Sequence, residues 1–403
     1  MIEKIYKEEL FTDKIGIFLV SILPITFIIG SSVLNSTIVL LDLIFLYTLV
    51  KKKQILYLKN KYFYSLIFIW LILLVSLFFS SNFYNSSTRA VGFLRFIFFI
   101  FSIKYFFEMN GKEFNNIIIK TWSLIFFVIT FDLIFEYIFG FNVLGFKSPM
   151  HGRLAGFLGD ELKIGGLYFG FAALTLAYVA SLKSIKKDLY IYMVLILFIS
   201  TAFIIGERSN FLKTLFILIG FILFYNKKKL LKKIFLIMSS FIIIFFIIST
   251  NDLLKYRFWT VFLKPMSNNP VLAIKNSQYG LLYEVGIQMF NNNKTYGVGL
   301  KNFREEMIKD EYNNAGSNHP HQLHFEILAE IGIVGYFSFF IFFVFNLYFS
   351  IKSFLTSRNN IQLSAILFVF CTLIPLLPSG SFFSSFGASI FWLNFALMLP
   401  KNN

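Results

Sequence analysis

Residues 317–336 read SNHPHQLHFEILAEIGIVGY, a polar loop that runs directly into an apolar helix. Pro320 suits the first position of that helix, because the N–H that proline lacks would be unpaired there, and Asn318 or His319 can cap it. His321 then falls in the first turn, where the positive end of the helix dipole disfavours imidazolium and keeps the ring neutral at pH 7. The N–H groups of the same turn favour a bound anion. The stretch therefore predicts a proton acceptor beside an anion subsite at the end of a membrane helix.

The chain around this stretch is too apolar for a soluble protein. Hydrophobic residues make up 57% of the 403 positions, and 57 residues are phenylalanine. A soluble globule of this size could not bury so much apolar surface, so we expect an all-α protein that crosses the membrane many times. The one cysteine, Cys371, lies in an apolar run, which excludes an intrachain disulfide and a thiolate metal site.

Twelve segments fit a spanning helix, which needs about 20 mostly apolar residues. They are residues 15–33, 34–50, 62–80, 88–108, 116–140, 164–182, 188–206, 209–225, 234–250, 325–350, 361–378 and 381–399. We therefore expect nine spans within residues 1–250, a large loop over residues 251–324, and three spans within residues 325–403.

The positive charge follows the expected spans. The formal net charge is +16, and most lysines fall in short gaps between apolar runs. The lysine-rich gaps are residues 51–61, 183–187, 226–233 and 352–360. Lysine and arginine collect on the cytoplasmic side of membrane proteins, so these gaps and both termini are expected there, and nucleic acid is not an expected partner.

The gap at residues 251–324 differs from the others. Its 74 residues carry eight Lys or Arg and six Asp or Glu, which is too polar for the membrane interior and too long for a simple connector. The alternation of spans places this loop, and all four histidines, on the extracytoplasmic side.

Two arginines are expected near His321 on that side. Arg153 lies in HGRLAGFLGDELKIGGLY before the sixth span, and Arg208 lies in the short turn GERSNF between spans seven and eight. Because the planar guanidinium matches phosphate oxygens, the two side chains could bind a pyrophosphate, although either could also pair with lipid head groups. His321 could act as a general base or serve only in loop packing.

The neighbouring histidines do not predict a metal site. Spacings of two and three residues do not bring His319, His321 and His324 to one point. We therefore expect no metal.

Other charged or glycine-rich positions have two interpretations each. Asp132 and Glu136 lie one turn apart in the fifth span, and Arg89 and Arg95 lie in the fourth, so the four could form structural ion pairs or line a substrate cavity. In TYGVGLKNF, residues 295–303, two glycines could bind an anion or form a tight turn.

Several stretches together resemble the bacterial O-antigen ligase and O-antigen polymerase superfamily. RLAGFLGDELKIGGLY is similar to its Arg-x-x-Gly-x-x-Gly-like segment, and GERSNF to its Gly-x-Arg-Ser turn. GVGLKNF and HPHQLHFEILAEIGIVG resemble its large-loop segment and the histidine motif with the helix that follows. The resemblance covers roughly residues 150–340. Phe325 replaces an aliphatic residue of the family pattern, and GDEL at residues 159–162 replaces an asparagine-containing segment.

The resemblance implies a metal-independent, inverting glycosyltransferase of the GT-C type that needs no cofactor. Its donor would be a glycan on undecaprenyl diphosphate, with His321 as general base and Arg153 and Arg208 on the diphosphate. Gln322 matches a position that is more often asparagine. The residues expected to bind substrate are Arg89, Arg95, Gln322, Glu330, Gly297 and Gly299.

The acceptor stays open at this point. It could be lipid A–core for a ligase, a second lipid-linked repeat for a polymerase, or a protein hydroxyl. The implied location is the inner membrane of a bacterium, in contact with membrane lipids and with the site facing the periplasm. The competing interpretation is a twelve-helix secondary transporter or a flippase for lipid-linked glycans, although paired broken helices are not evident.

Overall fold

The computed structural model describes residues 11–109, 111–159, 161–225, 230–309, 312, 317 and 319–400, which form helices and loops without a β-strand. Both termini, Asn318 as a cap, Asp160 of the GDEL segment and Lys227 to Lys229 lie outside the described residues.

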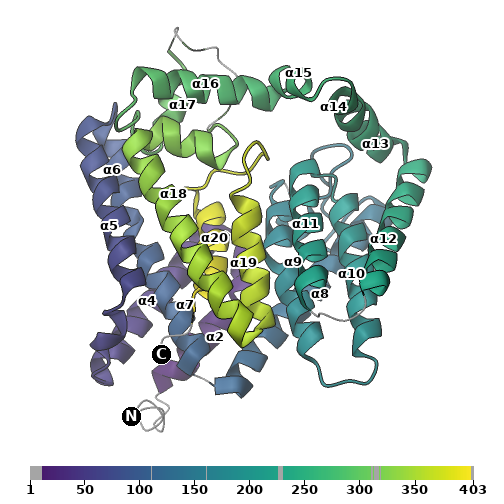
Figure 1. Ribbon diagram of the computed structural model, residues 1–403, viewed down its shortest axis with the longest axis horizontal. Coiled ribbons are helices and arrows are strands. Elements are labelled where there is room, and N and C mark those ends of the chain that lie inside the picture. Colours follow the sequence, from purple (N-terminus) through teal and green to yellow (C-terminus); the bar gives the residue numbers. More distant parts are fainter. Residues whose placement is uncertain are drawn as a thin grey trace.

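The helices follow the apolar runs of the sequence (Figure 1). In the first part of the chain they are α2 (Phe11–Ser21), α3 (Leu23–Ile29), α4 (Ser31–Lys51), α5 (Lys61–Ser76), α6 (Phe83–Gly92), α7 (Leu94–Met109), α8 (Gly111–Phe139), α9 (Ile164–Ser181), α10 (Lys187–Ile204), α11 (Arg208–Tyr225) and α12 (Leu230–Thr250). After α12 come α13 (Asp252–Lys255), the π-helix η4 (Tyr256–Leu263), α14 (Lys264–Asn268), α15 (Pro270–Lys275), α16 (Gln278–Asn292) and α17 (Phe303–Glu306). The chain ends with α18 (Leu323–Ser357), α19 (Asn360–Thr372) and α20 (Ser385–Met398).

Nine helices of the described chain are long and apolar enough to cross a membrane. A tenth span results if α2 and α3, which are bent by 53° relative to each other, count as one. The remaining two expected spans correspond to α19 and α20, which have only 13 and 14 residues. The count of twelve spans and the GT-C type therefore stay predictions.

Helix breakers explain where the boundaries differ from the expected ones. The break between α3 and α4 falls at Gly30. Its φ of 134° is not compatible with a helix, so α4 begins at Ser31 and not at residue 34. Residues 373–384 form a loop between α19 and α20, where residues 375–380 contain two prolines and a glycine. This loop reaches the site described below.

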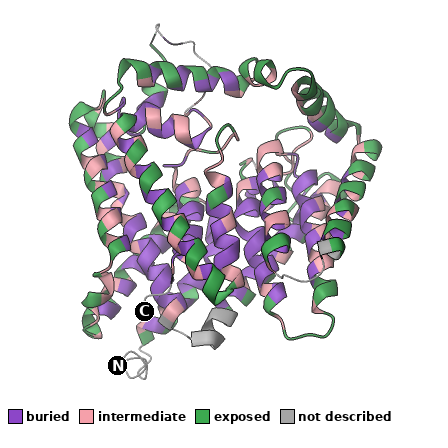
Figure 2. Cartoon of the chain, viewed as in Figure 1, coloured by how far each residue is buried: buried purple, intermediate pink, exposed green. Residues whose placement is uncertain are grey.

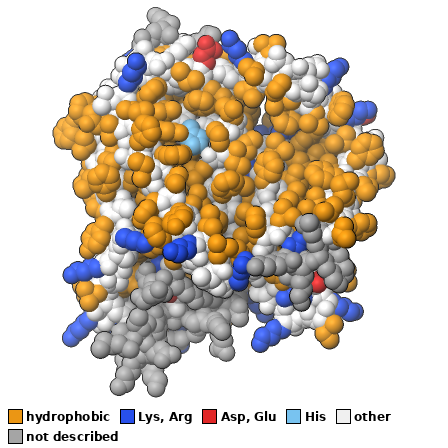
Figure 3. Space-filling view, in the orientation of Figure 1, with side chains coloured by type: hydrophobic (Ala, Val, Ile, Leu, Met, Phe, Trp, Pro, Cys, Tyr) orange, Lys and Arg blue, Asp and Glu red, His pale blue; other side chains and the backbone are white. Residues whose placement is uncertain are grey.

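The outer surface matches a membrane environment. In Figure 3 hydrophobic side chains cover a broad middle band, with Lys and Arg gathered at its upper and lower edges. Figure 2 shows the buried residues concentrated in the centre of the bundle, around α7, α9, α19 and α20. The protein is thus a helical bundle with an apolar perimeter, as expected of a multi-pass membrane protein.

The segment between α12 and α18 lies across one end of the bundle (Figure 1). Its helices are short, and much of α13 to α15 is exposed (Figure 2). The connections between α4 and α5 and between α9 and α10 lie at the opposite end. Arg153, Arg208 and His321 all belong to the end that this segment covers.

Candidate active site

The loop that carries Arg153 is held by buried carboxylates of α8. Glu136 accepts hydrogen bonds from the backbone N–H groups of Ala155 and Gly156, the latter at 2.7 Å. Asp132 accepts one from the N–H of Val143 at 2.9 Å. A carboxylate that binds loop amides fixes that loop against its helix.

The predicted ion pairing of Asp132 and Glu136 with Arg89 and Arg95 is therefore wrong. The two carboxylates bind backbone amides of the following loop, and Arg89 and Arg95 donate hydrogen bonds elsewhere. Buried backbone N–H groups must be satisfied, and the loop brings them to the carboxylates over only 11 to 20 residues of chain.

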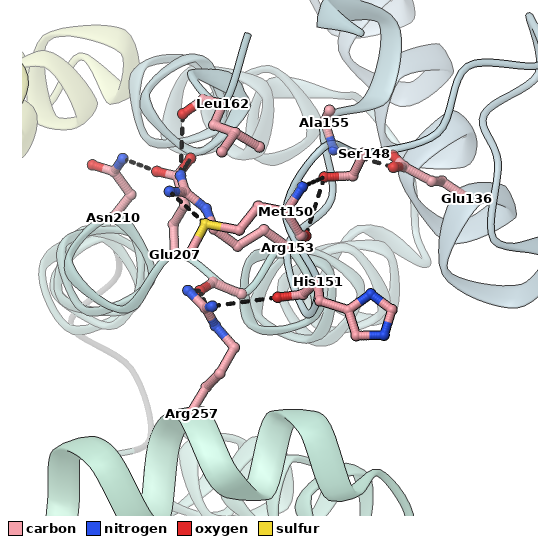
Figure 4. A network of polar contacts seen from close by, with 11 residues as sticks. Glu136, Ser148, Met150, His151, Arg153, Ala155, Leu162, Glu207, Asn210 and Arg257 are labelled. Carbon is pink, nitrogen blue, oxygen red and sulfur yellow. Dashed lines mark hydrogen bonds and ion pairs between the residues drawn. The ribbon is translucent and has the colours of Figure 1, made fainter. Parts of the chain in front are cut away.

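Arg153 forms an ion pair with Glu207 at the turn that precedes α11 (Figure 4). Its guanidinium also donates to the carbonyl of Leu162 at 3.1 Å. The two side chains are only 19% and 10% exposed, and Asn210 donates a further hydrogen bond to Glu207. A Cβ on Gly165 would lie 2.4 Å from the Glu207 carboxylate, so only glycine leaves room for this pair. Arg153 and the turn that carries Arg208 are thereby joined.

Arg257 of η4 binds the backbone of both loops (Figure 4). It donates to the carbonyl of Gly206 at 3.2 and 3.3 Å and to that of His151 at 3.5 Å. Burial lowers the pKa of Arg257, and the nearby charges of Arg153 and Arg208 lower it further. Three guanidinium groups, those of Arg153, Arg208 and Arg257, therefore share one site, and only the first two were predicted from the sequence.

Arg208 is the first residue of α11 and has the least engaged guanidinium of the three. Its side chain lies 5.9 Å from the ring of Phe262 and makes no hydrogen bond or ion pair with the residues that the structure describes. Glu207 is the one carboxylate that forms an ion pair with these three arginines, so the group keeps a net positive charge. A net positive charge on guanidinium groups suits a diphosphate anion.

His321 does not lie in the first turn of α18. The helix begins at Leu323, and Gln322 is its N-cap, with a side-chain oxygen that accepts from the N–H of His324 at 2.7 Å and of Phe325 at 3.1 Å. His321 precedes the cap in a left-handed conformation with φ 55°. The predicted position was wrong because Gln322 caps the helix in place of Asn318 or His319.

The imidazole of His321 is nevertheless kept neutral, by burial. Burial lowers the pKa of His321, and a hydrogen bond with the backbone of Ser379 opposes this only in part. The ring packs edge-on against Tyr279, with centroids 5.6 Å apart. An apolar wall, and not the helix dipole, therefore favours the proton-accepting form.

His319 stacks close to His321, whereas His324 points elsewhere. The His319 and His321 rings are 3.9 Å apart, and burial together with His321 lowers the pKa of His319 to about 4. His324 hydrogen-bonds the carbonyl of Leu373 at 2.9 Å and the hydroxyl of Tyr336 at 3.2 Å. The three imidazoles do not meet at one point, and no group of three His, Cys, Asp or Glu in the described part of the chain could hold a metal ion.

The loop between α19 and α20 connects His321 to the helix that carries Arg208. We call Arg153, Arg208 and Arg257 the arginine group. The N–H of Ser379 donates to the carbonyl of His321 at 2.7 Å. The carbonyl of the preceding Pro378 accepts hydrogen bonds from Ser209 and, at 2.8 Å, from Lys213, both on α11. His321 and the first turns of α11, the helix that begins at Arg208, are thus linked through two consecutive loop residues.

The other residues expected to bind substrate lie outside this group. Gln322 is 1% exposed and caps α18, so its side chain faces the helix backbone. Gly297 and Gly299 have φ of 69° and 95° and pack tightly, since a Cβ would lie 2.5 Å from the backbone of Glu330 and 2.4 Å from Ser80. Their contacts are those of a close-packed turn.

Glu330, Arg89 and Arg95 make no hydrogen bond or ion pair with Arg153, Arg208 or Arg257 among the described residues. Glu330 is 3% exposed, and its carbonyl accepts a hydrogen bond from the N–H of Gly299 at 2.9 Å. Arg89 and Arg95 line a separate cavity beside α20.

Residues 193–340 match the family model described as O-antigen ligase. This part of the chain is similar to the O-antigen ligase family. The match confirms the resemblance inferred from the motifs and includes Arg208, Arg257 and His321. No curated protein matches the chain in sequence. The family supports a membrane glycosyltransferase of the O-antigen ligase and polymerase type that uses lipid-linked glycans.

Proposed function

We propose that this protein transfers a glycan from an undecaprenyl diphosphate carrier to an acceptor hydroxyl, at the periplasmic face of a bacterial inner membrane. The proposal rests on one observation: a neutral, half-buried histidine and three arginines lie at the same end of a membrane bundle. General-base catalysis requires the first, and a departing diphosphate requires the second.

The mechanism is a single displacement with inversion. His321 accepts the proton of the acceptor hydroxyl while its oxygen attacks the anomeric carbon of the donor glycan. The bond between that carbon and the diphosphate oxygen breaks, and the diphosphate leaves with the electron pair. Arg208 and Arg153 stabilise the charge that develops on the diphosphate, which is the role that a metal ion has in other transferases, so we propose that no metal is required.

Glu207 and Arg257 have supporting roles in this proposal. Glu207 orients the guanidinium of Arg153 and offsets part of the positive charge. Arg257 donates to the carbonyls of Gly206 and His151 and so fixes the two loops relative to each other. Both are positioning residues.

The competing function is transport of a lipid-linked glycan. A transporter would bind the same diphosphate, but it would have no use for a neutral imidazole at the same end of the bundle as the arginines. The two functions therefore differ in the consequence of replacing His321.

The test uses membranes that contain the full chain and measures glycan transfer from the native lipid-linked donor. His321→Ala and Arg208→Gln are each expected to lower transfer by at least about 100-fold, with normal amounts of protein in the membrane. Arg304→Gln is the control, since Arg304 is an exposed arginine of α17 away from the site. Transfer at the wild-type rate in either variant would refute the assigned roles.

The acceptor is identified by the surface polysaccharide of a deletion strain. Loss of long chains from lipid A with free polymer retained indicates a ligase. Products with a single repeat indicate a polymerase.

A further inference from the structure

A cavity of about 240 Å³ lies where α6 and α7 meet the start of α20, with Lys301 of the 251–322 segment at its edge. This volume corresponds to about eight water molecules at roughly 30 Å³ each. Its lining residues are Thr88, Arg89, Gly92, Phe93, Arg95, Phe96, Lys301, Phe383, Ser385 and Ala388. Every charged residue among them is positive.

These three cations form no ion pair with any carboxylate that the structure describes. Arg89 donates to the carbonyl of Phe383, and Arg95 donates to the hydroxyl of Ser385 at 3.4 Å. The Nε of Arg95 is buried and has no hydrogen-bond partner among the described residues. A buried donor on a charged group is costly to leave unsatisfied, so a bound acceptor is expected.

The carboxylates nearest to the cavity are engaged in other contacts. Glu326 accepts hydrogen bonds from the hydroxyl of Ser381 and from the N–H of Phe382, the latter at 2.8 Å. Asp42 accepts one from Ser102 at 3.2 Å. Asp42, Glu326 and Glu330 act on Arg89 and Arg95 through space, without closing an ion pair. The positive charge at the cavity wall is therefore open to an external anion.

The same loop that binds His321 also reaches this cavity. Ser379 donates to the carbonyl of His321, and Phe383 and Ser385 line the cavity. Six residues of chain separate Ser379 from Ser385, which limits their separation to about 21 Å at about 3.5 Å per residue. A ligand held in the cavity therefore lies within reach of the proposed base.

We propose that this cavity is a second oxyanion site, which binds a phosphate-class group of the acceptor through Arg89, Arg95 and Lys301. The oxyanion binding stands on the cavity itself, and its assignment to the acceptor rests on the proposed glycosyl transfer. The site would fix one end of the acceptor while a hydroxyl further along the molecule reaches His321. The donor diphosphate would instead bind Arg153 and Arg208 of the arginine group.

The test follows arginine modification by phenylglyoxal on the full chain, with peptide mass spectrometry to identify each arginine. One arm adds inorganic phosphate to the detergent-purified protein. The other compares vesicles of phosphatidylcholine with vesicles that also contain phosphatidic acid. In at least one arm, modification of Arg95 is expected to slow by about five-fold or more.

Lys301→Gln, at an exposed position, is expected to abolish this protection. Lys275→Gln is the matched control, because Lys275 is an exposed lysine of the same segment outside the cavity. Protection by phosphatidic acid alone identifies a lipid-borne phosphate, whereas protection by inorganic phosphate shows that the phosphate group is sufficient. A rise in melting temperature with the same probes, in wild type but not in Lys301→Gln, provides a second measurement that needs no reaction at Arg95.

The proposal is overturned if neither probe protects Arg95 or stabilises the protein, or if Lys301→Gln responds as the wild type does. Protection of Arg208 without Arg95 would overturn this site alone and leave the proposed transfer intact. Loss of transfer in Arg208→Gln together with normal protection of Arg95 supports both sites. Full transfer in Arg208→Gln with protection of Arg95 would overturn the proposed function but retain the oxyanion site.

Discussion

The buried imidazole of His319 makes the protein less stable in acid, and His319→Gln should remove part of this loss. The pKa of His319 is lowered from 6.5 to about 4 in the folded protein, first by burial and then by His321. At a pH between these two values, the imidazole of His319 is protonated in the unfolded chain but not in the folded protein. The free energy of unfolding therefore has its full value above pH 6.5 and decreases as the pH falls toward 4. Over this range of 2.5 pH units, at about 1.4 kcal/mol each, the loss is about 3.5 kcal/mol.

Thermal unfolding in detergent, followed by tryptophan fluorescence, can measure this loss. With a melting entropy of about 2.1 cal/mol/K per residue for 403 residues, about 3.5 kcal/mol corresponds to about 4 °C. Between pH 7.5 and 4.5, a range that includes about 2 of these pH units, the melting temperature of the wild type should fall by about 3 °C more than that of His319→Gln. His151→Gln, which replaces an exposed histidine, should behave as the wild type does. Equal acid sensitivity of wild type and His319→Gln would show that the imidazole is not excluded from water, and would refute the reasoning.

Three further predictions concern the site and its loops. Tyr279→Ala should open the imidazole of His321 to water and move its pKa back toward 6.5, so the acidic limb of the pH–rate profile shifts to higher pH while the rate at pH 8 changes little; a purely structural effect would lower the rate equally at every pH. Glu136→Gln should destabilise the protein by about 1–3 kcal/mol in thermal unfolding, because two buried loop amides lose a charged acceptor. Gly206→Ala should lower transfer without changing any charge, since its Cβ would lie 2.1 Å from the carbonyl of Gly152 at a φ of 77°, and a wild-type rate would show that the two loops need not touch.

The helices could be predicted because a membrane demands long apolar runs with polar gaps, and the sequence shows both. The alternation of spans then places Arg153, Arg208 and His321 at one end, where the structure has them. Helix ends were less predictable. Asn318, His319 and Gln322 are all plausible caps, and the selection of Gln322 depends on how the loop packs over Tyr279 and not on local sequence.

Arg257 could not be predicted, because no periodicity determines how a 74-residue polar segment folds back over the bundle. It lies in η4, after α12 and α13, and only its tertiary contacts with Gly206 and His151 reveal its role. The partners of Asp132 and Glu136 were missed for a related reason. A sequence lists side-chain charges, but it does not show which backbone N–H groups a loop brings to them.

The distribution of ion pairs supports anionic ligands at this end of the bundle. The described residues contain five ion pairs, and of the arginines and lysines that line the two proposed sites only Arg153 takes part in one. A protein that kept these cations for stability alone would pair them, because an uncompensated charge near an apolar interior is destabilising. Instead the carboxylates Asp132, Glu136 and Glu326 bind backbone amides of the loops that shape the sites. Negative charge of the protein fixes the loops, and the positive charge is left to bind groups that the protein itself does not contain.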